Sequence, residues 1–461
     1  MSISLALLAG AALRIWMYQK FFLANGDTLV YGDIARNLLQ HGQYALGTAQ
    51  PAATLIRLPG YPLFLAACFS LFGVGNYGAV VAVQTALELA GCLLLAEFAR
   101  RSVPAGRGTA AAQGALWLAA LCPFTAVYAA SVLAETPTLF ALALAMWAAI
   151  RFVRRPGWGA GLAFTAGVTW AALLRPDGVL ALVLLPPVAM AGMRAGQASA
   201  MERRRMARIA VVCVALALAP FAAWTARNWR VFHVVEPLAP RSAADPGEPV
   251  YPGWERWVRT WMLDFNSTYQ IYWNVPGDEL DTAKLPERAF DSPAQREETA
   301  ALAAEYNANR RQLTPALDAG FARLAAERVA AHPLRYHVGL PLGRAADMWL
   351  RPRVGNLNID LDWWAYSHHH NETEFSWFYA GLNALYLLLA AAGLWLRPRM
   401  GAWLLAYMAL RSVALAATVT APEARYTLEC FPMLFVLGGV ALGEAWRRMT
   451  MSVMKRRPAP A

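Results

Sequence analysis

Long apolar stretches separated by short basic connectors dominate this chain of 461 residues. Several of these stretches run for about 17–22 residues without a fixed charge, which is the length that a helix needs to cross the hydrocarbon core of a bilayer. Hydrophobic residues make up 58% of the chain and charged residues only 15%, a balance too apolar for an ordinary soluble protein. The sequence therefore predicts an all-α polytopic membrane protein with about ten spanning helices, near residues 3–22, 77–98, 109–128, 133–152, 157–174, 179–193, 209–226, 375–396, 401–419 and 428–446.

The formal net charge of +11 would ordinarily raise nucleic acid as a partner. The basic residues are instead spread over connectors that fall on the same side of the predicted helices, which is the positive-inside pattern. We therefore expect no nucleic-acid partner and place the cytoplasmic side at Arg100, Arg101 and Arg107; Arg151, Arg154 and Arg155; Arg194, Arg203, Arg204, Arg205 and Arg208; Arg397 and Arg399; and Arg447, Arg448, Lys455, Arg456 and Arg457.

This orientation predicts three parts. Residues 1–226 would form an N-terminal transmembrane module with a first periplasmic loop at about 25–76, residues 227–374 a periplasmic loop domain, and residues 375–461 the C-terminal helices with a basic cytoplasmic tail. Residues 61–72 are apolar but too few to span, which favours an interfacial helix. Apolar residues at three- and four-residue steps predict one amphipathic helix over 294–331, packed within the loop domain.

Cysteine and histidine patterns give no metal site. The five cysteines lie in apolar stretches without metal-type spacing or a close pair, so we expect neither a disulfide framework nor a zinc site. His368, His369 and His370 are adjacent, and three consecutive side chains cannot all face one ion comfortably.

The first loop carries an acidic pair, Asp27 and Asp33, in the run GDTLVYGD over residues 26–33. Two interpretations are open. Asp27 could cap the helix that contains Asp33. Alternatively, one of the carboxylates could stand at the mouth of a cavity as a general base.

Other charged residues occur at predicted periplasmic helix ends. Arg57 begins the segment RLPGYPL and could either snorkel to the interface or bind a phosphate through its fork of N–H groups. Glu135 in SVLAETP could favour a helix N-terminus or belong to a site, because a carboxylate at a membrane boundary must be paired or wet.

Further short motifs at the same side are Arg175-Pro176-Asp177-Gly178, Arg227-Asn228-Trp229-Arg230 and Glu423-Ala424-Arg425-Tyr426. Arg425 could meet a phosphate or simply pair with Glu423. Arg14 lies inside the first predicted helix, where it needs a partner or water, and we expect it to support Asp27.

Together these motifs resemble those of the dolichyl-phosphate-mannose protein mannosyltransferases and the lipid A aminoarabinose transferases, known as glycosyltransferase family 39 and its relatives. In that family an acidic residue of the first periplasmic loop is followed four residues later by Tyr and then by a small-residue helix, as in Asp27, Tyr31 and Ala35 here. Many members have two adjacent acidic residues, whereas Thr28 follows Asp27 in this chain. Asp33 and Glu135 are the alternatives for the second carboxylate.

The resemblance implies a C-type (GT-C) helical bundle with interfacial helices and a periplasmic loop domain. It also implies an inverting glycosyltransferase in a bacterial inner membrane, moving a hexosyl or pentosyl group from a polyprenyl-phosphate donor to a hydroxyl or amine of an envelope lipid, glycan or protein. Some relatives use a divalent cation, and the sequence leaves that cofactor open. The implied catalytic candidates are Asp27, Asp33 and Glu135, the implied donor-phosphate ligands are Arg57, Arg227 and Arg425, and the supporting residues are Arg14, Tyr31, Tyr61, Arg175, Asp177 and Tyr426.

Two alternatives come from other classes of protein. A polytopic lipid or sugar transporter or flippase would also contain many helices and buried charge, but the sequence shows no matched halves with broken helices. A non-catalytic membrane assembly partner would tolerate the loss of Asp27.

Overall fold

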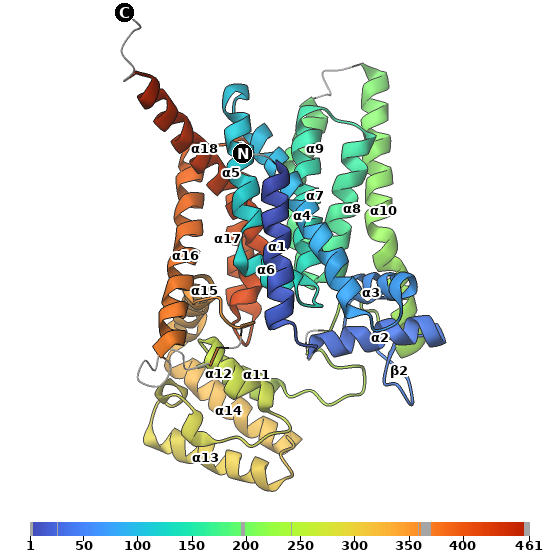
Figure 1. Cartoon of the computed structure of the whole chain (residues 1–461). Coiled ribbons are helices and arrows are strands. Elements are labelled where there is room, and N and C mark those ends of the chain that lie inside the picture. Colours follow the sequence, from blue (N-terminus) through green and yellow to red (C-terminus); the bar gives the residue numbers. More distant parts are fainter. Residues whose placement is uncertain are drawn as a thin grey trace, which may run out of the picture. The chain divides into compact units, whose positions relative to one another are not determined.

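Helices account for most of the chain in the computed structural model, which describes residues 3–24, 26–194, 199–240, 242–357, 359–360 and 370–455 (Figure 1). Helices make up 76% of the described residues. In the described residues the strands are β1 (Ala45–Leu46) and β2 (Ala52–Ala53), which pair antiparallel with Ala45 opposite Ala53. The all-α expectation is confirmed.

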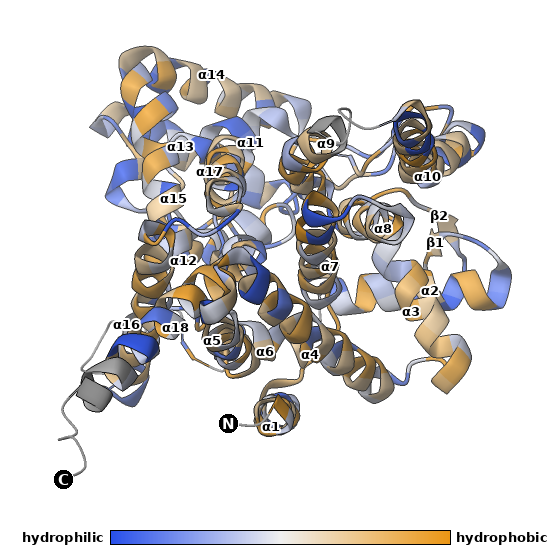
Figure 2. Cartoon of the chain, turned by 90° about the horizontal axis from the view of Figure 1, so that it is seen from above, coloured by the Kyte–Doolittle hydropathy of each residue, from blue (hydrophilic) through white to orange (hydrophobic). Residues whose placement is uncertain are grey.

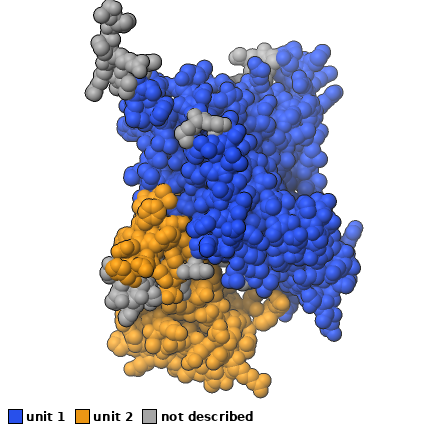
Figure 3. Space-filling model, viewed as in Figure 1, with its two compact units in different colours: residues 1–247, 384–409, 428–461 blue, residues 248–383, 410–427 orange. Residues whose placement is uncertain are grey.

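Contacts divide the chain into two compact units (Figure 3). Unit 1 contains residues 1–247, 384–409 and 428–461, and unit 2 contains residues 248–383 and 410–427. The C-terminal part of the sequence thus contributes to both units. The three-part organisation expected from the sequence stays a prediction.

The helices of unit 1 include most of the long apolar segments. They are α1 (Ile3–Phe21), α2 (Asp27–His41), α3 (Gly60–Phe72), α4 (Tyr77–Ser102), α5 (Gly108–Ala120), α6 (Pro123–Ala129), α7 (Glu135–Arg154), α8 (Trp158–Leu174), α9 (Leu185–Arg194), α10 (Ala200–Phe232) and α18 (Phe431–Lys455), with parts of α16 (His370–Trp395) and α17 (Gly401–Thr418).

Six helices in the described ranges are long and apolar enough to cross a membrane, or seven if one bent pair counts as a single span. Hydrophobic residues colour much of α1, α4, α7 and α8 in the view from above (Figure 2). The other predicted spans also coincide with helices, but these are shorter or carry charge: α1 contains Arg14 and Lys20, and α8 has 17 residues. The multi-pass character is confirmed with fewer clear spans than the ten predicted.

Two predicted spans differ in form from the expectation. The span near 109–128 is divided into α5 and α6, which bend by 55° at a break before Pro123, because proline cannot donate the backbone hydrogen bond that would continue the helix. The span near 179–193 begins as a 3₁₀ helix, η2 (Pro176–Leu184), and becomes α9 at Leu185.

Close packing of small residues joins α5 to α18. A Cβ atom added at Gly439 would lie 2.4 Å from the backbone nitrogen of Ala115, so a larger residue would push the two helices apart. Small residues allow such close backbone approach between membrane helices, where dispersion contacts stabilise packing.

The first loop forms the short helices α2 and α3 with the β1–β2 hairpin between them. In Figure 1, α2 runs across the direction of α1 and α10 at one end of that bundle. Asn37 of α2 donates hydrogen bonds from Nδ2 to the carbonyl oxygens of Ala45 (2.9 Å) and Gly47 (3.1 Å). The hairpin is therefore fixed to α2 by side-chain contacts, and residues 60–72 form the separate helix that the sequence predicts.

Unit 2 contains α11 (Pro252–Arg259), α12 (Phe265–Gln270), α13 (Pro293–Ala308), α14 (Pro315–Ala331) and α15 (Leu340–Leu350). Residues of α11, α13 and α14 and of the segment after α12 form an aromatic-rich core. The prediction of one amphipathic helix over 294–331 is wrong, because α13 ends at Ala308 and α14 begins after Thr314. The Thr314 hydroxyl caps α14, and Pro315 occupies its first turn. The apolar residues of both helices, including Tyr306 and Phe321, pack in the core of this unit as expected.

Candidate functional site

Asp27 stands at the first residue of α2, with Gly26 at the position that precedes the helix. Its Oδ1 atom accepts a hydrogen bond from Nη2 of Arg57 at 2.7 Å, and both side chains are about one quarter exposed. Thr28 beside it is buried and donates its hydroxyl to the carbonyl oxygen of Val132 at 3.1 Å. The start of α2 is thus held against the turn that precedes α7, while the ion pair remains accessible.

Arg57 is positioned by the backbone around it. The hydroxyl of Tyr44 donates to the carbonyl oxygens of Arg57 (2.9 Å) and Leu58 (3.2 Å). Two residues beyond Leu58, α3 begins at Gly60, where an added Cβ would lie 2.5 Å from the carbonyl oxygen of Leu173. The start of α3 can approach the end of α8 this closely only because residue 60 is glycine. This contact fixes the position of the chain that runs from Arg57 into α3.

Tyr31 and Tyr61 form the aromatic wall beside this ion pair. Their ring centroids lie 4.8 Å apart, and the Arg57 guanidinium carbon is 5.9 Å from the centre of the Tyr31 ring. Burial first, and then the negative charge of Asp27, raise the pKa of Tyr31 to about 12. The phenol therefore keeps its proton at neutral pH and can donate a hydrogen bond to an anionic group.

Glu135 and Arg175 form a second ion pair near the first. Arg175 Nη1 lies 3.1 Å from Glu135 Oε1, and Glu135 is buried at the first residue of α7. The charges of Glu135 and Arg175 act on the pKa of Tyr31, as do those of Asp27 and Arg57. The two carboxylate–arginine pairs therefore share Tyr31 as a neighbour, and the sequence motifs that contain them are brought together.

Arg175 also contacts two further carboxylates. Its Nε atom lies 2.8 Å from Oε1 of Glu429 and 3.4 Å from Oδ1 of Asp177. Glu429 is buried in the 3₁₀ helix η8 (Ala424–Cys430), just before α18. One guanidinium thus contacts three carboxylates.

Glu429 was not among the site residues predicted from the sequence. Glu429 lies at the start of the span predicted for residues 428–446. An ionisable residue within a membrane span is a candidate functional residue by default, so its position alone could have identified it. The same signal applied to Glu88 within the predicted span 77–98.

Glu88 is the partner of Arg14. Arg14 is fully buried, and its Nε atom lies 2.6 Å from Glu88 Oε2, while Nη1 donates to the carbonyl oxygens of Gly10 and Ala120 at 2.8 Å each. The structure therefore gives Arg14 the role of joining α1 to α4 and to the end of α5. A supporting role toward Asp27 stays a prediction.

Asp33 has its own local contacts in the first loop. It pairs with Arg36 at 3.2 Å, and its Oδ2 atom accepts from the backbone nitrogen of Gly47 at 2.5 Å. These contacts fasten the β1–β2 hairpin to α2. In the described part of the chain, Asp27 pairs with Arg57, a predicted phosphate ligand. Asp33 instead contacts Arg36 and Gly47.

Arg227 holds the first loop from α10. Its Nη1 and Nη2 atoms donate to the carbonyl oxygens of Thr54 (2.7 Å) and Tyr44 (2.9 Å). Its guanidinium carbon also lies 5.2 Å from the ring centre of Trp224. The arginine predicted to bind phosphate is thus engaged with backbone oxygens.

Arg425 and Tyr426 belong to unit 2. Arg425 Nε lies 2.6 Å from Glu423 Oε2, and the hydroxyl of Tyr426 donates to Glu423 Oε1 at 2.6 Å. Glu423 is buried, so this turn is organised around a carboxylate, as one of the two sequence interpretations expected. Convergence of Arg425 with Arg57 and Arg227 stays a prediction.

In the described ranges, no group of three or more His, Cys, Asp or Glu side chains is arranged to hold a metal ion. His368 and His369 lie outside the described residues, and His370 contacts Glu374 at 3.4 Å. A divalent cation stays a prediction.

Comparison with known proteins gives no matching family model and no matching curated protein. Among solved structures, the chain is similar to the Archaeoglobus fulgidus oligosaccharyltransferase, in a complex with Zn and sulfate (12% identity, TM-score 0.49, 98% of this chain and 50% of that one). It is also similar to ArnT from Cupriavidus metallidurans bound to undecaprenyl phosphate (14% identity, TM-score 0.40, 99% of this chain and 81% of that one). The chain spans about half the length of the oligosaccharyltransferase.

Proposed function

We propose that the protein is a GT-C-type membrane glycosyltransferase that moves a sugar from a polyprenyl-phosphate-linked donor to an acceptor hydroxyl or amine. The ion pair between Asp27 and Arg57 carries this proposal. Asp27 is the expected base, and Arg57 is expected to bind the donor phosphate. These two residues are 30 positions apart in the sequence but are in direct contact. Tyr31 and the Glu135–Arg175 pair surround them with further hydrogen-bond donors and charge.

In the proposed reaction, the acceptor oxygen or nitrogen attacks the anomeric carbon of the sugar. The bond from that carbon to the phosphate oxygen breaks, and polyprenyl phosphate leaves with the bonding electron pair. The acceptor proton passes to the Asp27 carboxylate. A single displacement of this kind inverts the anomeric carbon, and fixed arginine charges stabilise the phosphate as its negative charge increases.

The contact between Asp27 and Arg57 suggests how donor binding prepares the base. A phosphate that enters beside Arg57 competes with Asp27 for the guanidinium, because phosphate oxygens match its geometry well. A carboxylate that loses part of its cationic partner becomes more basic. Donor binding would therefore increase the basicity of Asp27 when the acceptor needs it.

We place the reaction on the periplasmic face of a bacterial inner membrane, with an envelope lipid, glycan or protein as acceptor. The positive-inside pattern of the connectors supports this orientation. In a variant without native cysteines, a membrane-impermeant thiol reagent should label His41→Cys in the first loop and Ala294→Cys in α13 on intact cells. Both positions are exposed. Labelling only after lysis would contradict the proposed side of the membrane.

Reconstitution separates the proposed enzyme from a transporter. Purified protein in nanodiscs would be incubated with a panel of radiolabelled undecaprenyl-phosphate sugars and an envelope extract. We expect release of free undecaprenyl phosphate together with a labelled acceptor, and loss of both in Asp27→Asn. Movement of the intact lipid-linked sugar across proteoliposomes, with no cleavage by the same preparation, would support a flippase and contradict the proposal.

A further inference from the structure

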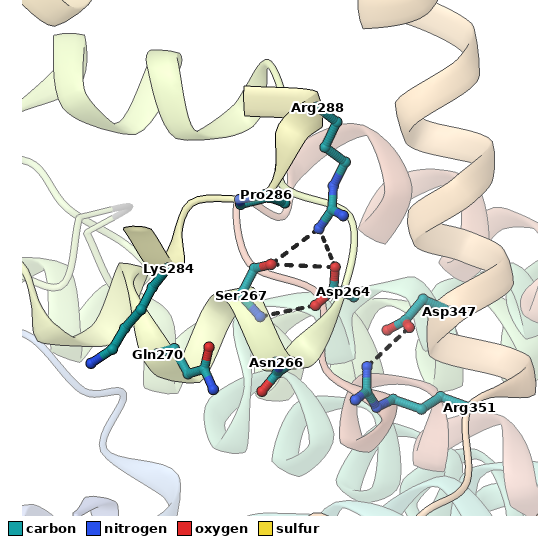
Figure 4. A pocket seen from close by; sticks show the side chains of 9 residues that line it. All are labelled: Asp264, Asn266, Ser267, Gln270, Lys284, Pro286, Arg288, Asp347 and Arg351. Carbon is teal, nitrogen blue, oxygen red and sulfur yellow. Dashed lines mark hydrogen bonds and ion pairs between the residues drawn. The ribbon is translucent and has the colours of Figure 1, made fainter. Parts of the chain in front are cut away.

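Unit 2 contains a polar pocket of its own, with a volume of about 410 Å³ (Figure 4). This volume falls in the range of about 300–1,000 Å³ that small-ligand sites occupy. The side chains come from α12 and the residue before it, from the loop that follows, and from the end of α15, and include Asp264, Asn266, Gln270, Arg288, Asp347 and Arg351. None of them belongs to the site proposed for sugar transfer.

The cations of this pocket are already matched by carboxylates. Arg288 contacts both Asp264 and the Ser267 hydroxyl, and Arg351 Nη1 lies 3.3 Å from Asp347 Oδ1 (Figure 4). Lys284 is 4.0 Å from Asp281 just outside the pocket. A phosphate or another anion would have to displace these carboxylates. The lining therefore favours a neutral ligand that both donates and accepts hydrogen bonds.

Hydrogen-bond acceptors are in excess at one part of the lining. Asn266 Oδ1 is buried and has no hydrogen-bond partner in the described part of the chain. The terminal torsion of asparagine is broad, so its amide can turn toward a group in the pocket. Burial also raises the pKa of Asp347 to about 6. A ligand hydroxyl could donate to either group and accept from a neighbouring arginine or amide.

An aromatic row lies on the neighbouring side of the same segment. Phe265, Tyr269 and Trp273 follow at four-residue spacing, with the Trp273 ring centroid 5.7 Å from each of the other two. Tyr269 is 49% exposed and Trp273 47% exposed. A sugar ring presents hydroxyls at its edge and apolar C–H groups on its face, and aromatic side chains provide a flat apolar surface for such a face.

We propose that the pocket between α12 and α15 binds a carbohydrate part of the acceptor, with hydroxyls toward Asn266, Asp347 and Arg351 and a sugar face toward Tyr269 or Trp273. The assignment of this ligand to the acceptor rests on the proposed function. Binding itself needs neither the lipid-linked donor nor Asp27, so the two proposals fail separately.

The test is saturation-transfer NMR on the full-length protein in nanodiscs. The probes are the neutral sugars glucose, galactose, N-acetylglucosamine and the disaccharide cellobiose, each titrated up to about 50 mM so that complexes weaker than millimolar are detected. We expect saturable transfer to at least one of these sugars. Asn266→Leu and Asp347→Asn should each raise its Kd about tenfold or more, and either Tyr269→Ala or Trp273→Ala should remove transfer to the C–H protons of the stacked face.

Two controls separate pocket binding from other effects. Glu305→Gln removes a carboxylate from an exposed position of α13 and should leave the Kd unchanged, whereas Asp27→Asn should strongly reduce transfer activity but keep sugar binding. Absence of saturable binding to every sugar would overturn the proposal. Equal Kd values in wild type and both pocket variants, or competition by inorganic phosphate at equal concentration, would also overturn it.

Discussion

The Arg57 guanidinium lies 2.7 Å from the Asp27 carboxylate and joins the start of α2 to the segment that leads into α3. Each side chain keeps about a quarter of its surface exposed. The Asp27–Arg57 pair is therefore more exposed than the Arg14–Glu88 pair, in which both side chains are buried. Because the Asp27–Arg57 pair is only partly buried, a substrate can reach it, and it is better suited to exchange partners with a substrate than the buried Arg14–Glu88 pair is.

Replacing Arg57 should impair use of the lipid-linked donor. Arg57→Ala removes charge-assisted hydrogen bonds to phosphate, which are worth about 1.5–3 kcal/mol each, and should raise the donor KM about tenfold to a hundredfold. Arg57→Lys should recover part of this loss, because it restores charge without the fork. Steady-state kinetics with varied donor provide the measurement. Arg36→Ala is the matched first-loop control, and equal KM changes in both variants would argue against phosphate binding by Arg57.

Arg227 should behave differently from Arg57. Because its guanidinium donates to the carbonyl oxygens of Tyr44 and Thr54, Arg227→Ala leaves these oxygens without their donor and loosens the first loop from α10. We expect faster limited proteolysis within residues 42–58 and a lower melting temperature. An intact first loop combined with a selectively raised donor KM would instead favour the phosphate role expected from the sequence.

The contacts of Arg175 predict a compensating pair of substitutions. Arg175→Ala leaves the buried carboxylates of Glu135 and Glu429 without their shared cation, and breaking a buried ion pair in this way costs about 3–5 kcal/mol. Adding Glu429→Gln removes one of the two buried charges that contacted Arg175 and should restore part of that stability. Thermal unfolding of the two single variants and the double variant measures the coupling. Strictly additive losses would mean that Arg175 and Glu429 do not interact.

Asp347 should make the stability of the protein depend on pH. Burial raises its pKa to about 6, above the value of about 3.9 that an exposed aspartate has. A raised carboxyl pKa means that ionisation destabilises the folded state, so stability should increase as pH falls from about 7.5 through 6 and level off below about 4. Asp347→Asn should melt higher than wild type near pH 7.5, with a difference that shrinks toward pH 5. The same pH profile in Asp347→Asn and wild type would exclude Asp347 as the cause, and Glu305→Gln is the control.

Much of the first loop could be predicted from the sequence. The spacing from Asp27 to Tyr31 places both at the start of one helix, and the structure has that helix at Asp27–His41. The apolar run after Pro59 predicted a short helix, observed at Gly60–Phe72. Local signals were sufficient in both cases because each helix begins at a glycine- or proline-containing turn.

Other features depend on contacts that local patterns do not contain. The three- and four-residue spacing of apolar residues continues from α13 into α14, so periodicity alone could not reveal the break between them. Arg310 and Arg311 there adopt positive φ values of 53° and 60°, which sequence rarely predicts for arginine. The meeting of Arg175 with Glu429 joins residues more than 250 positions apart and needs the packed bundle.

The central claim is that Asp27 takes the acceptor proton, and a single-turnover assay of Asp27→Asn tests it most directly. The substitution keeps the shape of the side chain and a hydrogen bond to Arg57 while removing the base. With donor and acceptor both saturating, the rate of sugar transfer should fall about 10²–10⁴-fold in a folded, membrane-inserted variant, whereas Asp33→Asn should retain activity. Near-wild-type transfer by Asp27→Asn would contradict the account, and its loss in Asp33→Asn alone would show that Asp33 is the base.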